Sequence, residues 1–184
     1  MLYVLVLFIS TTCFSQEKIG EDEILYVKIN TINEVIHSTG LIQFYLSKDK
    51  SDNNFGKPIV EQLWRDMLNN CNELIADFPN SEYFFETLYT KAITEEALGN
   101  IIVAKEFYTK VLNFETPKTA FKNKSLRALA FLAIEEKDYT KALGYLDQVK
   151  NYEVYYDCGV PYQGDKKSLE IMYQKCHDGL NKKK

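Results

Sequence analysis

Regularly spaced helix breakers constrain the fold of this chain more than any other feature of its sequence. Breaks fall at residues 79–81, 99–100, 116–117 and 137–138, and between them apolar residues recur every three or four positions. This spacing is typical of amphipathic helices, which proline and glycine terminate. No segment alternates polar and apolar residues as a half-buried strand does. The sequence therefore predicts an all-α fold made of antiparallel helix pairs.

The same pattern divides the chain into segments. The expected helices span residues 21–36, 41–46, 59–78, 82–98, 101–114, 118–136, 139–149 and 166–179. The stretch 48–57 is polar and turn-rich, which predicts a linker, and Pro58 then suits the first position of the next helix. We expect a signal peptide at 1–15, a degenerate N-terminal helical unit and linker at 16–57, helix pairs at 58–150, a loop and capping helix at 151–181, and a disordered tail at 182–184.

Two of the expected helix pairs repeat each other at an offset of 38 residues, the distance from Ala104 to Ala142. At the same offset, Ala92 of the first pair matches Ala130 of the second. Small side chains at such positions allow two antiparallel helices to approach closely. We therefore expect all four alanines at helix crossings.

Residues 88–117 and 126–149 resemble the tetratricopeptide repeat, a family whose units are helix pairs of about 34 residues. The resemblance implies a right-handed α-solenoid of antiparallel helix pairs. A C-terminal capping helix would cover the last apolar face, which would otherwise be exposed to water. The resemblance also implies a concave groove lined by the first helix of each pair.

The resemblance assigns seven residues to that groove. Family members that clamp a terminal carboxylate carry lysines and asparagines there, whereas this chain carries Tyr89 and Ile93. A mixed apolar and acidic groove suits a peptide or an amphipathic segment of a protein partner better. The expected anchors are Tyr89, Arg127 and Phe131, although Phe131 could instead pack between repeats. The residues expected to contact the partner are Glu86, Tyr89, Ile93, Glu96, Arg127, Phe131 and Ile134.

The N-terminus has the pattern of a secretion signal. Residues 2–9 form an unbroken apolar run, and small residues then lead to a cleavage position between Ser15 and Gln16. Eight apolar residues are too few to span a bilayer, so we expect no integral membrane span after cleavage. We expect export to the periplasm or the extracellular space, with a lipoprotein acylated at Cys13 as the alternative. No lysine or arginine precedes the apolar run, which leaves open a different start codon or a buried N-terminal strand.

Three cysteines remain after this cleavage. Cys71 lies in a strongly helical stretch and is expected to be a small buried core residue. Cys158 and Cys176 flank a turn-rich loop, and we expect a disulfide between them, with two reduced packing thiols as the alternative. No CxxC or HxxxH spacing indicates a metal site.

No set of residues indicates catalysis or a bound cofactor. The only histidines, His37 and His177, lie at opposite ends of the chain, and the sequence has no nucleotide-binding, hydrolase or zinc-protease motif. The acidic pairs at 95–96 and 135–136 could act as paired carboxylates, but we expect them on a solvated face. A formal net charge of −4 and the lack of a basic stripe argue against a nucleic-acid partner.

We therefore expect a non-enzymatic protein–protein interaction module that binds a peptide or protein partner in its groove. Two alternatives remain. One is an immunity-type inhibitor that fits an acidic surface to a secreted toxin. The other is a secreted enzyme without a recognisable motif, which would use Glu95, Glu96 or the region 158–177.

Overall fold

The structure is a computed structural model, and it describes residues 19–38, 40–46, 50–115, 119–152 and 163–182. All eight elements are α-helices, and the described ranges contain no strand, so the all-α prediction is confirmed. The predicted signal peptide and residues 183–184 of the predicted tail lie outside these ranges. The helices are α1 Glu21–Ser38, α2 Leu41–Leu46, α3 Lys50–Asp77, α4 Phe84–Ala97, α5 Ile101–Asn113, α6 Thr119–Glu135, α7 Tyr139–Val149 and α8 Gln163–Asn181.

The predicted linker at 48–57 is wrong from Lys50 onward, because α3 begins there and Pro58 lies inside the helix. Tertiary contacts overcome the weak local preference. The Trp64 ring meets the Tyr45 ring of α2 edge-on, with their centroids 4.8 Å apart, and the Lys57 ammonium lies 5.7 Å from the same tyrosine ring. Pro58 is exposed, and its missing N–H removes one hydrogen bond from the helix.

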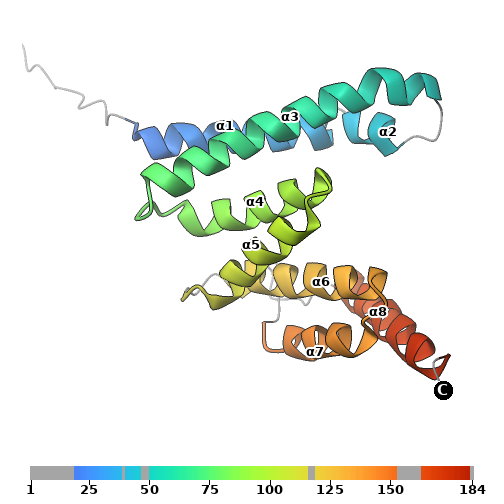
Figure 1. Ribbon diagram of the computed structural model, residues 1–184. Coiled ribbons are helices and arrows are strands. Elements are labelled where there is room, and N and C mark those ends of the chain that lie inside the picture. The colour runs from blue at the N-terminus through green and yellow to red at the C-terminus, as the bar shows by residue number, and fades with distance from the viewer. Residues whose placement is uncertain (1–18, 39, 47–49, 116–118, 153–162, 183–184) are drawn as a thin grey trace, which may run out of the picture.

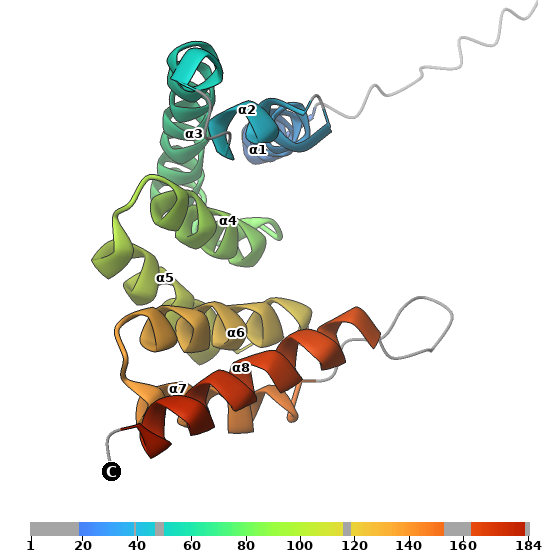
Figure 2. The same cartoon turned by 90° about the vertical axis from the view of Figure 1, so that its right-hand side faces the viewer.

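Apart from α1, which packs mainly on α3, each helix packs mainly against its neighbours along the chain. In Figure 1 the helices follow one another from α1, α2 and α3 at the top to α7 and α8 at the bottom. Helices α1 and α2 pack on α3, and contacts then run from α3 to α4, α5, α6 and α7 in turn. The last helix, α8, packs on both α7 and α6, as the turned view in Figure 2 also shows.

Three apolar clusters occur in the same order. The first joins α1, α2 and α3 and includes Trp64 and Cys71. The second holds α4, α5 and α6 together around Tyr108, and the third joins α6, α7 and α8 around Leu146 and Cys176. The core is therefore divided along the molecule, so that each helix contributes to only one or two clusters.

The turns after α4 and α6 have the same backbone design. Gly99 and Lys137 both have positive φ values, 83° and 61°. In each turn the next residue, Asn100 or Asp138, donates its backbone N–H to the carbonyl five residues earlier, at 2.8 and 2.9 Å. This pattern is the Schellman motif, which satisfies the last carbonyls of a helix. The two turns are separated by the same 38 residues as the sequence repeat.

The four predicted small residues lie in the apolar clusters that join the helices. Ala92, Ala104, Ala130 and Ala142 are all completely buried. The alanine pattern in the sequence therefore identified tightly packed positions correctly. Within the described ranges, none of the helices combines the length and the apolar character needed to cross a membrane.

Candidate functional site

The two predicted groove carboxylates on α4 are engaged by tyrosines of this chain. The Tyr26 hydroxyl of α1 donates a hydrogen bond to Glu86, and the Tyr108 hydroxyl of α5 donates one to Glu96 over 2.6 Å. Burial raises the pKa of Tyr108 above its usual range, and the hydrogen bond to the Glu96 carboxylate raises it further. Both glutamates therefore link α4 to other helices.

The other two predicted groove residues on α4 pack against the second cluster. The Tyr89 ring lies 5.2 Å from the Phe121 ring of α6 and 6.1 Å from the Tyr108 ring, centroid to centroid. Burial raises the pKa of Tyr89 to about 12. Ile93 is partly buried against the same cluster. These contacts give Tyr89 a structural role in joining α4 to α6.

The three predicted groove residues on α6 have different surroundings. Ile134 is buried in the third cluster together with Met172 and Cys176 of α8. Phe131 is 44% exposed and lines a pocket of about 390 Å³ whose other residues belong to α8. Arg127 is half-buried, and its positive charge acts on Tyr89. The predicted set is therefore not gathered in one open groove, because α8 packs over part of α6.

The expected solvated face is found at the acidic pair 135–136 and not at 95–96, where Glu96 is half-buried. Glu95 is buried and accepts a hydrogen bond of 2.8 Å from the Asn100 side chain, so its predicted exposure is wrong. This bond ties the end of α4 to the start of α5. Glu135 and Glu136 are exposed. Among the described residues, no group of histidine, cysteine, aspartate or glutamate could hold a metal ion.

Cys71 is completely buried, as predicted, and burial raises the pKa of its thiol to about 12. Cys176 is also a completely buried free thiol. Cys158, its expected disulfide partner, lies outside the described residues, and so does Cys13. The disulfide therefore stays a prediction, and the observed packing of Cys176 is that of a core side chain.

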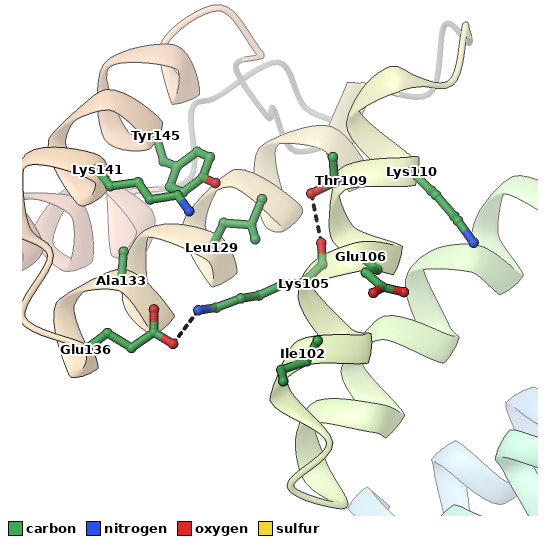
Figure 3. A pocket seen from close by; sticks show the side chains of 10 residues that line it. All are labelled: Ile102, Lys105, Glu106, Thr109, Lys110, Leu129, Ala133, Glu136, Lys141 and Tyr145. Carbon is green, nitrogen blue, oxygen red and sulfur yellow. Dashed lines mark hydrogen bonds and ion pairs between the residues drawn. The ribbon is translucent and has the colours of Figure 1, made fainter.

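A pocket of about 550 Å³ opens between α5 on one side and α6 and α7 on the other (Figure 3). We call it the α5–α7 groove. Its size lies within the range of known ligand sites. Six of its ten lining residues are exposed, so it is an open groove and not an enclosed cavity. The lining residues are Ile102, Lys105, Glu106, Thr109, Lys110, Leu129, Ala133, Glu136, Lys141 and Tyr145.

The α5–α7 groove has an apolar floor. Leu129 and Ala133 of α6 are each 2% exposed, and the half-buried Tyr145 of α7 stands beside them. On the opposite wall, Ile102 is 77% exposed at the start of α5. Exposed aliphatic surface beside an apolar floor is a feature of binding surfaces, since leaving it in water is unfavourable.

Charged side chains form the rim of the groove. Lys105 makes an ion pair with Glu136, which links α5 to the end of α6 across the groove, as the dashed line in Figure 3 shows. The Lys110 ammonium lies 4.2 Å from the centroid of the Phe107 ring. Lys141 is exposed on α7. Three lysines and two glutamates give the lining a net charge of +1, opposite in sign to that of the whole chain.

The sequence prediction missed this groove because the resemblance implied a groove lined by the first helix of each pair, whereas α5 corresponds to an expected second helix. One signal was present in the sequence. Ile102, Lys105, Glu106 and Thr109 recur with the spacing of a single helix face, and that face begins with a large aliphatic residue. The floor could not be found in this way, because Leu129 and Ala133 have the pattern of ordinary core residues.

Comparison of the chain with protein-family models, with curated proteins and with solved structures gave no match.

Proposed function

We propose that this chain is a non-enzymatic protein-interaction module that binds a segment of a protein partner in the α5–α7 groove. The observation that carries the proposal is the combination of the buried floor at Leu129 and Ala133 with the exposed Ile102. A partner side chain that enters the groove would remove apolar surface of both molecules from water. An enclosed site for a small molecule would bury most of its ligand, whereas this groove is open along its rim.

The repeated turns support a tetratricopeptide-like arrangement as part of the proposal. In this interpretation α4–α5 and α6–α7 are two helix pairs of a right-handed α-solenoid, and α8 is the capping helix. The groove would then lie on the side of the second helices, opposite the concave surface that the resemblance implies. The apolar run at residues 2–9 supports export, so the partner would be met in the periplasm or outside the cell.

Two matched variants test this function. Ile102→Glu introduces a charge at the groove, and Ile171→Glu makes the same change at an isoleucine of α8 that is 51% exposed. Both variants and the wild type would be used to capture partners from native envelope extract after their thermal stability has been compared. We expect a stoichiometric partner with the wild type and with Ile171→Glu, and its loss with Ile102→Glu. Equal capture by all three would refute the groove as the binding site.

A further inference from the structure

The rim of the α5–α7 groove carries positive charge that is available to a partner. Lys141 is exposed, and its ammonium forms no hydrogen bond or ion pair with the described part of the chain. The Lys110 ammonium lies over the face of the Phe107 ring, which does not neutralise its charge. An ammonium beside an apolar floor favours a ligand that combines a carboxylate with an apolar side chain.

The third rim lysine already has a carboxylate as its partner. Glu136 belongs to the turn after α6, and its side chain crosses the groove to the Lys105 ammonium of α5 (Figure 3). The Glu136 side chain is 53% exposed and that of Lys105 is 25% exposed. Ion pairs in such solvated positions contribute little stability, so this one can be exchanged readily for another.

We propose that the α5–α7 groove binds an acidic amphipathic helix, and that Glu136 occupies the site of one of its carboxylates while the groove is empty. The inference rests on the proposed function and adds the chemistry of the partner. The helix would lay its apolar side chains on Leu129 and Ala133 between α5 and α7. One carboxylate replaces Glu136 at Lys105, and a second reaches Lys141.

The shape and the charge of the site favour this occupant. An amphipathic helix presents apolar residues at intervals of three or four along one face, which suits a groove between two helices. The whole chain carries a net charge of −4, so an acidic ligand gains nothing from long-range attraction and depends on the local lysines. Binding of such a ligand would therefore report on these particular side chains.

The test uses three fluorescein-labelled synthetic peptides of about four helical turns, which correspond to roughly 14 residues. All three carry leucine on one helix face. The other positions are mainly glutamate in the first peptide, glutamine in the second and lysine in the third. Fluorescence anisotropy gives their affinities for the full chain at low and high salt. At low salt we expect the glutamate peptide to bind most tightly, the glutamine peptide less tightly and the lysine peptide most weakly. At high salt the affinities should differ less, because screening weakens exposed charge pairs.

The variants give effects of opposite sign. Glu136→Gln releases Lys105 and is expected to tighten binding of the glutamate peptide by roughly two- to fivefold. Lys105→Gln and Lys141→Gln are each expected to weaken it by a similar factor. Lys175→Gln, the same change on the exposed face of α8, serves as the control and should leave the affinity unchanged. A gain of affinity from the loss of a native ion pair is not expected from damage to the fold.

Three results would overturn the inference. Equal affinities for the three peptides, with no effect of Glu136→Gln, would leave a groove that binds partners without charge selection, and the proposed function would stand. Failure of all peptides to bind would reject the acidic helix as the occupant. The proposed function is tested independently by comparing partner capture by the wild type and by Ile102→Glu. Sedimentation that shows wild-type self-association, lost in Ile102→Glu, would identify a second copy of the chain as the occupant.

Discussion

Replacement of Gly179 by alanine tests the close approach of α8 to α7, which determines how much of α6 is covered. A Cβ atom at Gly179 would overlap Cε2 and Cζ of the Tyr139 ring. Gly144, on the exposed side of α7, has no neighbouring atom within 4 Å of the same added atom. The same substitution therefore meets an obstacle at one glycine and open space at the other.

The expected magnitude combines two effects of opposite sign. Alanine is favoured over glycine within a helix by up to about 1 kcal/mol. Overpacking of a tight contact typically costs about 1–3 kcal/mol. Gly144→Ala should therefore stabilise the fold by up to about 1 kcal/mol, whereas Gly179→Ala should destabilise it by up to about 2 kcal/mol. In a Tyr139→Ala background the obstacle is gone, and Gly179→Ala should become stabilising.

Urea unfolding followed by circular dichroism would measure all four variants and the coupling between positions 139 and 179. A change of 1 kcal/mol shifts the Tm of a domain of this size by about 2–4 °C, so thermal scans provide an independent check. If Gly179→Ala stabilised the wild type as much as Gly144→Ala, the close contact between α8 and Tyr139 would not exist in solution. The account of why Ile134 is buried would then fail as well.

Three further substitutions and one chemical reaction probe the core and the turns. Ala104→Leu and Ala142→Leu should each destabilise the fold by about 1–3 kcal/mol in urea unfolding, because both sites are completely buried. A loss of stability below about 0.5 kcal/mol at both sites would mean that the helices are loosely packed there. Gly99→Ala should lower the unfolding free energy by about 1 kcal/mol or more, since its φ of 83° is strained for alanine, and an unchanged Tm would contradict the turn geometry. Native Cys71 should resist iodoacetamide at pH 8 and react only in denaturant, because burial raises its pKa to about 12; mass spectrometry of the labelled peptides would detect the opposite result.

The sequence alone predicted the elements whose signals are local. Pro79 and Gly99 mark the ends of helices because they act through their own backbone, whereas Pro58 lies inside α3. Apolar spacing marks the faces of helices. The alanine pattern predicted tight packing at positions 104 and 142, and both side chains are completely buried. The turn at Lys137, where φ is positive, was predicted although no glycine marks it.

The tertiary structure decided which helix faces meet, and this determined the candidate site. Helix α3 extends through the predicted linker because α2 packs against it, and Ile134 is buried because α8 folds back onto α6. The α5–α7 groove joins Ile102 to Tyr145 from helices on either side of α6. Such contacts form because burying apolar surface lowers the free energy, and the surfaces involved are distant in the sequence. Local sequence patterns therefore do not predict which of these surfaces meet.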